Sequence, residues 1–327
     1  MKNKFLILLI CCFAAFVGDL ALGSVTISIK EIYHALFVDS ESIFYQIIIH
    51  HRLPKALTAI HIGASLSVAG LLMQTLFKNP LAGPDVLGIN SGASLGVALL
   101  TLGGTSLPFF MNNGYAQVLA AIIGAILILL LVLLTSTKVK STVSLLIVGV
   151  MFGYFTNSIV SILQNISNPD TLKLFITWTF GSLSAVGWDQ MIILSPILIG
   201  AIFCATLLVK QLNVFLLGSQ YAKGLGISIQ HTRLYIILIT AILAGTATAF
   251  TGPIGFIGIT IPHIARGLFR TSNHKIILPA SILCGATILL ICDIISQLPT
   301  FNATLPINAV TSLFGAPIIL WILLKRK

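Results

Sequence analysis

The chain has 327 residues, of which 57% are hydrophobic and only 8% are charged, and its formal net charge is +10. Soluble domains contain about 25% charged residues, so this composition excludes a water-soluble globular enzyme. The mean hydropathy of +1.06 predicts an all-α integral membrane protein, because open strands cannot span lipid.

Apolar runs of bilayer-crossing length recur along the whole chain and predict ten helical spans in a single polytopic domain, 1–327. Their approximate bounds are 4–23, 56–76, 86–107, 115–134, 142–165, 191–209, 233–251, 254–268, 276–296 and 306–324. The first run follows Lys2 and Lys4 and ends in small residues, as a secretory signal does. It is longer than a signal core, so we expect a retained helix.

The distribution of positive charge predicts the orientation of these spans. With a cytoplasmic N-terminus, most of the 18 Lys and Arg residues fall in cytoplasmic loops, and the opposite threading reverses this bias. Both termini are therefore expected in the cytoplasm. The basic residues are spread over several loops and form no stripe with aromatic residues, so we expect no nucleic-acid partner.

Four charged residues near the expected external side bear on mechanism. Arg52 and Lys55 open the second span; composition leaves open whether they anchor at the lipid interface or receive an acidic partner. Asp19 and Asp293 are the only acidic residues within apolar runs, and we expect both near the outer ends, where water reaches them. An autonomous ion-coupled carrier normally needs ionisable residues deeper in its spans, so this alternative is disfavoured.

Glycine and proline mark both helix packing and helix breaks. Gly92 and Gly96 repeat at four-residue spacing and predict close helix contacts. The loop 79–85 contains two prolines and follows the second span, and irregular backbone at membrane depth requires protein or a water-filled cavity around it. The stretch 252–258 is expected to form a re-entrant turn or a broken helix rather than a phosphate-binding loop.

The segment 213–227 is too polar to span and contains a short amphipathic pattern on the expected cytoplasmic side. Such a hairpin can lie on the membrane or insert into a groove of a partner, and its residues leave both open. No G-x-x-x-x-G-K-[ST] motif and no His/Cys/Asp/Glu cluster with metal spacing occurs. We therefore expect no cofactor bound by this chain, no catalytic residues and no intramembrane enzyme.

A series of motifs adds a family resemblance that covers nearly the whole chain. The motifs are R-L-P-[RK] at 52–55, G-A-x-L-x-x-x-G at 63–70, N-P-L-A-x-P at 79–84, L-G-I-x-x-G-A at 87–93, W-x-x-G-S-L at 178–183, L-G-x-x-x-A-x-x-L-G at 217–226 and G-P-I-G-F-I-G-x-x-x-P-H-x-A-R at 252–266. In this order they resemble the FecCD/BtuC-type permease subunits of binding-protein-dependent ABC importers, which carry iron–siderophore complexes, haem or cobalamin.

The resemblance implies a multi-pass subunit in the bacterial cytoplasmic membrane with spans 2–5 and 7–10 as inverted repeats. Its expected partners are a second permease subunit, identical or distinct, two ATPase subunits that hold ATP and Mg²⁺, and an extracytoplasmic substrate-binding protein or lipoprotein. An iron–siderophore complex is the expected cargo, with haem or cobalamin as the alternative.

The resemblance also implies roles for particular residues of this chain. Docking of the binding protein falls to Arg52 and Lys55, although Lys55 replaces the commoner Arg, and Gln297 stands where the family often has a third basic residue. The cytoplasmic gate is implied at Asn79, Leu81, Ser141 and Thr142. The contact with the ATPase is implied at Leu217, Gly218, Ala222, Leu225 and Gly226.

Overall fold

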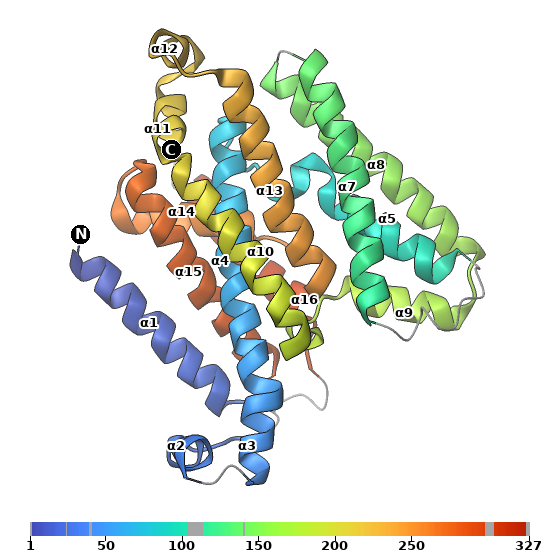
Figure 1. The fold of residues 1–327 in the computed structure, drawn as a ribbon, viewed down its shortest axis with the longest axis vertical. Helices are drawn as coiled ribbons and strands as arrows, with labels where there is room; N and C mark the ends of the chain where they lie inside the picture. The colour runs from blue at the N-terminus through green and yellow to red at the C-terminus, as the bar shows by residue number, and fades with distance from the viewer. Residues whose placement is uncertain are drawn as a thin grey trace.

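The computed structural model describes residues 2–23, 25–38, 41–103, 114–139, 141–297 and 304–324. Within these ranges the secondary structure is entirely helical, which confirms the predicted class (Figure 1). The longest helices are α1 (Lys2–Ala21), α4 (Leu53–Phe77), α7 (Gly114–Lys138), α8 (Thr142–Ile166), α10 (Trp188–Leu207), α13 (Ile229–Thr251) and α15 (His274–Ser296).

Seven helical stretches among the described residues are long and apolar enough to cross a bilayer. Three shorter apolar helices accompany them: α5 (Ile89–Leu102), α14 (Ile257–Phe269) and α16 (Ile307–Leu324). Each of the ten predicted apolar runs coincides with one of these helices over its described part, and residues 104–107 of the third run lie outside the described residues. The second stretch is longer than expected, because α3 (Ile43–Ile47) and the π-helix η1 (Ile48–Arg52) continue directly into α4.

Short helices lie at the two ends of the bundle. At one end, called here the α2 end, are α2 (Ile29–Phe37) and α3; at the opposite end, the α12 end, are α11 (Val209–Leu217) and α12 (Ser219–Gly224) (Figure 1). The remaining short elements are η2 (Pro84–Leu87), α9 (Pro169–Thr179) and η3 (Leu183–Ala185).

Helix α4 forms the centre of the bundle. It contacts α10, α13, α14 and α15, and nearly all of its side chains beyond its first turns are buried. A helix that is apolar around its whole circumference is expected in such a position. In contrast, α1, α8 and α10 keep many large apolar side chains exposed, as lipid-facing helices do.

Small residues allow the closest helix contacts. A Cβ atom on Gly63 of α4 would overlap the carbonyl of Gly285 in α15, and a Cβ atom on Gly96 of α5 would overlap that of Ala120 in α7. Gly92 faces Gly124 across the same pair of helices. The predicted role of Gly92 and Gly96 in close packing is confirmed.

Two features of the chain path fit the repeat implied by the resemblance. Helix α4 runs from the α2 end to the α12 end, whereas α13 starts beside α12 and runs back (Figure 1). Helix α13 ends at Thr251 and α14 starts at Ile257, so the stretch 252–258 is a broken helix, one of the two expected forms. Gly252 has a φ of 71° and Phe256 a φ of 65°, and the strained Phe256 supplies the sharp change of direction.

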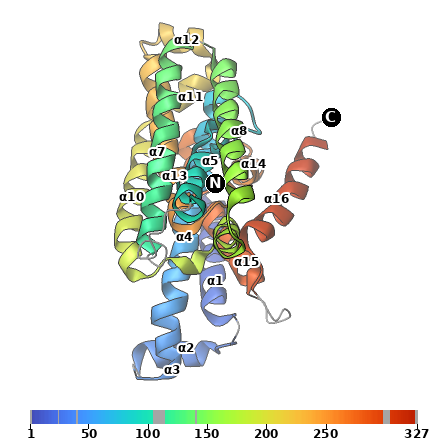
Figure 2. The same cartoon turned by 90° about the vertical axis from the view of Figure 1, so that its right-hand side faces the viewer.

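Helix α16 leans away from the rest of the bundle (Figure 2). It contacts α14 and α15. Pro317 lies within it and leaves the backbone carbonyl four residues earlier without its helical donor.

Candidate docking, gating and coupling sites

The π-helix η1 positions the basic residues at the α2 end. The N–H of Leu53 donates to the carbonyl of Ile48, five residues earlier, so this turn is wider than an α-turn, and Pro54 has no N–H to donate to the carbonyl of Ile49. The indole Nε1 of Trp188 donates to the freed carbonyl of Ile49 at 2.7 Å. This contact fixes η1 against the start of α10.

Arg52 is buried beneath this turn, with 8% of its surface exposed. Its Nη1 donates to the carbonyl of Leu20 at 2.6 Å, and its Nη2 donates to the carbonyl of Val25. Both acceptors belong to the C-terminal end of α1 and the residues that follow it, where helical carbonyls lack partners. Arg52 therefore caps α1 from the second span.

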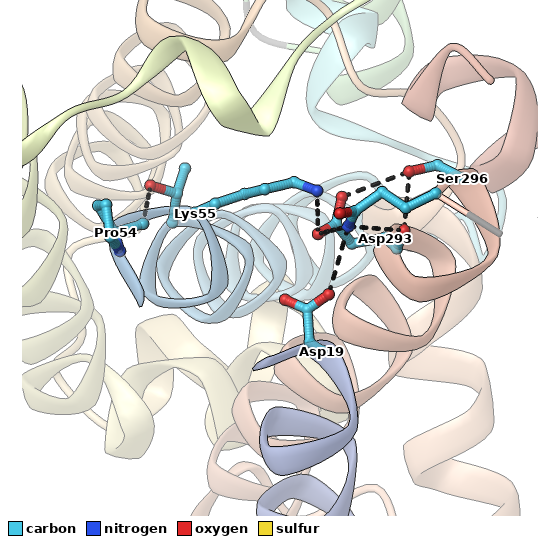
Figure 3. Close-up of polar contacts among 7 residues, drawn as sticks. Asp19, Pro54, Lys55, Asp293 and Ser296 are labelled. Carbon is cyan, nitrogen blue, oxygen red and sulfur yellow. Dashed lines mark hydrogen bonds and ion pairs between the residues drawn. The ribbon is translucent and has the colours of Figure 1, made fainter. Parts of the chain in front are cut away.

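Lys55 makes an ion pair rather than a free surface charge. Its Nζ lies 2.8 Å from Oδ2 of Asp293 in α15 (Figure 3). The Nε2 of Gln297 donates to the same oxygen at 2.8 Å and reaches Oδ1 of Asp19 in α1 at 3.5 Å. The four side chains tie α1, α4 and α15 together at the α2 end.

The expectation that water reaches Asp19 and Asp293 is wrong for Asp19, whereas Asp293 lines a cavity of about 390 Å³ together with Lys55 and Gln297. Only 3% and 2% of the surfaces of Asp19 and Asp293 are exposed, because the ends of α1, α4 and α15 close over the two carboxylates. Buried carboxylates require a cation or hydrogen-bond donors. Lys55 and Gln297 supply them.

A cavity of about 610 Å³ lies beside this cluster. Arg52 and Lys55 line it together with His50, His51 and Gln297. The structure thus brings the two predicted docking residues to one outer cavity, where both already have internal partners. An acidic group that docks there meets a pocket rather than two protruding side chains.

The first predicted gate segment follows the end of α4. Lys78 has a φ of 48° and ends the helix in the left-handed region. Oδ1 of Asn79 then accepts from the N–H of Leu81 at 2.9 Å, an Asx-turn. Pro80 accepts through its carbonyl from Nε2 of His263 in α14 at 2.7 Å. The turn presents Leu81, which is 41% exposed.

The second predicted gate segment lies at the start of α8, at the same end of the bundle (Figure 1). Ser141 is the N-cap, and its Oγ accepts from the N–H of Ser144 at 3.4 Å; Thr142 begins the helix. Nη1 of Arg233 donates to the carbonyl of Val139 at 3.1 Å and links this turn to α13. The two gate segments are therefore anchored on different helices, the first on α14 and the second on α13.

The predicted coupling residues form a hairpin, α11–α12, at the α12 end. Ala222 is buried, and its N–H donates to the carbonyl of Gly218 at 3.0 Å. Gly218 and Gly226 have φ values of 113° and 75°, which only glycine adopts easily. Leu217 and Leu225 are 64% and 61% exposed.

Other residues at this end of the molecule were not singled out by any motif. Tyr221 projects beside the predicted leucines and is 69% exposed. Asn213 and His274 are hydrogen-bonded to each other between α11 and α15. A polar Asn in an apolar segment was the only signal for this contact, because the partner lies on another helix. In the described part of the chain no group of three or more His, Cys, Asp or Glu residues is arranged to hold a metal.

Comparison with known proteins shows which family shares this architecture. The model of the FecCD transport family matches residues 7–325. The hemin transport system permease protein HmuU of Yersinia pestis is 32% identical over 324 residues, 99% of this chain and 95% of that protein. The vitamin B12 import system permease protein BtuC of Salmonella newport is 38% identical over 278 residues, 84% and 82% of the two chains.

Two solved structures share the fold. One, described as a metal-chelate type ABC transporter in an inward-facing conformation, covers 99% of both chains with a TM-score of 0.86 and 29% identity. The other, PsaBC from Streptococcus pneumoniae, has a TM-score of 0.54 and 19% identity over 90% of this chain and 94% of that one, a likeness of fold alone. The chain belongs to the FecCD transport family: it is a multi-pass membrane permease of a bacterial ABC importer, a transport subunit rather than an enzyme.

Proposed function

We propose that this permease imports an iron–siderophore complex across the cytoplasmic membrane. The observation that carries the importer class is the family match over residues 7–325, and the iron–siderophore cargo follows the family resemblance of the sequence. The relatives named above transport haem and vitamin B12, and the similar solved transporter is of the metal-chelate type. These cargoes are all metal chelates, so a metal chelate is the class of cargo that the similarity supports.

Competitive uptake distinguishes the cargo. The complete transporter, with its ATPase and binding protein, is reconstituted in proteoliposomes and supplied with a radioactive ferric siderophore, haemin or cobalamin. We expect ATP-dependent uptake of the ferric siderophore. Uptake of only haemin or cobalamin would leave the importer assignment intact and replace the cargo; accumulation of any of the three without the ATPase would contradict the ABC mechanism.

The geometry supports a mechanism in which energy enters at the hairpin α11–α12 and acts on the gate. Leu217, Tyr221 and Leu225 expose apolar surface at the α12 end, and exposed apolar anchors of this kind fit a hydrophobic groove of a partner. ATP binding in that partner shifts the permease between conformations because it favours one of them. The turn that carries Asn79 and Leu81 lies at the same end (Figure 1) and opens or closes the pathway.

Substitution of the hairpin tests this coupling. A Leu225→Asp change places a charge in the proposed apolar contact, and we expect uptake to fall by about tenfold or more, the loss that follows from about 1.4 kcal/mol of contact energy. Ser272→Asp is the matched control, because it adds the same charge to an exposed loop at the same end. Undiminished uptake by Leu225→Asp would show that the hairpin is not the coupling element.

Docking of the binding protein is proposed at the outer cavity lined by Arg52 and Lys55. Charge pairing there provides registry and association rate more than affinity. We expect Lys55→Gln to slow association of the binding protein and to reduce its dependence on salt, measured by surface plasmon resonance on nanodiscs. Assembly with the ATPase serves as the control for folding. An unchanged association rate would place docking elsewhere.

A further inference from the structure

Asn213 joins the coupling hairpin to the first turn of α15. Its Oδ1 accepts from the backbone N–H of His274 at 2.8 Å and lies 2.9 Å from Nδ1 of the same residue. Its Nδ2 donates to Oδ1 of Asn273 at 3.0 Å, and Asn273 in turn caps α15 by accepting from the N–H of Lys275. The amide of Asn213 thus has its oxygen and nitrogen fixed by separate partners.

The His274 ring extends this connection to α4. Its Nε2 lies 2.8 Å from Oγ1 of Thr75, and the two residues are 2% and 4% exposed. Because the Asn213 oxygen can only accept, Nδ1 carries the proton. Burial favours the neutral ring, so Nε2 is an acceptor, and the single hydroxyl proton of Thr75 is shared between this nitrogen and the carbonyl of Leu71, 2.8 Å away in its own helix. Each of the three side chains is oriented by its neighbour.

Thr75 lies in the last turn of α4, which ends at Phe77 and continues into the gate turn at Asn79. A displacement of Thr75 is therefore transmitted to that turn through a short piece of helix. The gate turn has a second anchor on α14, where His263 contacts the carbonyl of Pro80 and Ile259 accepts from Gln74. The end of α4 is thus held on two sides. The contact of Thr75 with His274 leads to the hairpin, whereas the contacts of Gln74 and Pro80 with α14 do not.

We propose that Asn213, His274 and Thr75 form a relay that carries displacement of the hairpin α11–α12 to the gate turn. His274 is the positioning residue at its centre: it touches neither cargo nor nucleotide and acts by keeping α11, α15 and α4 in register. The relay rests on the proposed coupling function of the hairpin. It supplies a contiguous polar connection between the two sites, and the two-state element that coupling also requires is the gate turn itself.

The test separates transmission from folding by using two matched threonines of α4. Thr75→Val removes the hydroxyl that meets His274. Thr58→Val removes a hydroxyl that is equally buried and bonds only to the carbonyl of Pro54, 2.7 Å away in its own helix. Both substitutions conserve shape, and both proteins are assembled with the ATPase in proteoliposomes.

The readout is the state of the gate and needs no cargo. Leu81→Cys, in a background without the exposed Cys11 and Cys204, is labelled with a maleimide before and after the ATPase is trapped with ATP and vanadate. We expect the nucleotide-dependent change in labelling rate to shrink by about fivefold or more in Thr75→Val, the lower range of measured coupling factors, while ATP hydrolysis continues. Thr58→Val should behave as the parent.

A double substitution adds a second criterion. If the contact is the functional unit, Thr75→Val combined with His274→Gln should reduce the gate response no further than either change alone. A parental gate response in Thr75→Val, or full additivity in the double variant, would overturn the relay.

Failure of the relay and failure of the hairpin assignment give different results. If Leu225→Asp abolishes the gate response and Thr75→Val does not, only the relay is wrong. If Leu225→Asp also leaves the response intact, the hairpin is not the coupling element and the relay has no input.

Discussion

Lys55 connects two roles that a motif alone cannot separate. Its ammonium group lies in the outer cavity, where a docking partner can approach, and it neutralises the buried Asp293. Gln297 bridges Asp293 to Asp19, so a change at any one of these positions alters the hydrogen bonding of the others. Loss of one member of a buried ion pair costs more than its net stabilisation, because the other charge stays buried.

Lys55→Met is therefore expected to destabilise the protein by about 3 kcal/mol, the lower part of the range for breaking a buried pair, since Gln297 still donates to Asp293. The additional change Asp293→Leu should recover most of this loss. Half-lives of the detergent-solubilised protein at elevated temperature measure both effects. A double variant as short-lived as Lys55→Met would show that the charge left on Asp293 is not the cause.

For individual residues, the sequence predicted which side chains matter but not which residues they contact. Motif spacing was sufficient to single out Arg52 and Lys55, but their contacts with Leu20 and Asp293 come from helices far away in the chain. Asp19 and Asp293 were expected in contact with water because each lies near a helix end. Burial of such an end depends on which other helices converge there, and no local pattern records this.

The elements of the bundle depend on backbone contacts as much as on apolar side chains. Gly63 in α4 and Gly285 in α15 lie against each other without room for a Cβ atom. The van der Waals contact between two such surfaces stabilises helix pairs where lipid offers no hydrophobic driving force. Four-residue glycine spacing predicted close packing, whereas the identity of each facing helix required the structure.

Gly63→Ala should force α4 away from α15 and destabilise the protein by about 1–3 kcal/mol, the usual cost of overpacking. Gly200→Ala on α10 is the matched control, because nothing lies within 4 Å of a Cβ atom there, and replacing a helical glycine stabilises by about 0.5–1 kcal/mol. Thermal inactivation in detergent compares the two. Equal stability of both variants would contradict the close contact between α4 and α15.

The whole molecule has two distinct ends, and charge predicts which end faces the cytoplasm. The α12 end carries the hairpin and both gate segments (Figure 1), and the α2 end carries the cavity with Arg52 and Lys55. Composition and the distribution of Lys and Arg were sufficient for the membrane class and for an expected orientation. The hydropathy pattern did not predict helices α2 and α9, because they are too short or too polar to span.

Cysteine labelling in intact cells tests this orientation. Tyr221→Cys on α12 should react with a membrane-impermeant maleimide only after the cells are opened, and Tyr33→Cys on α2 should react in intact cells. Both side chains are well exposed in the permease, and the permease is produced without its ATPase so that the proposed partner does not cover Tyr221. The reverse pattern would invert the proposed direction of transport.

The central position of α4 has a consequence for biogenesis. The ribosome synthesises α4 before α13, α14 and α15, so lipid surrounds α4 until those helices are made. Two of its hydroxyl groups suit this delay, because Thr58 and Ser67 donate to carbonyls of their own helix and so present no unsatisfied donor to hydrocarbon. Gln74 has no such partner within α4; its amide is bonded by Ile259 and Arg266. Newly made protein truncated before α14 should therefore leave α4 with one unsatisfied amide, a mark by which quality control can distinguish unfinished chains from finished ones.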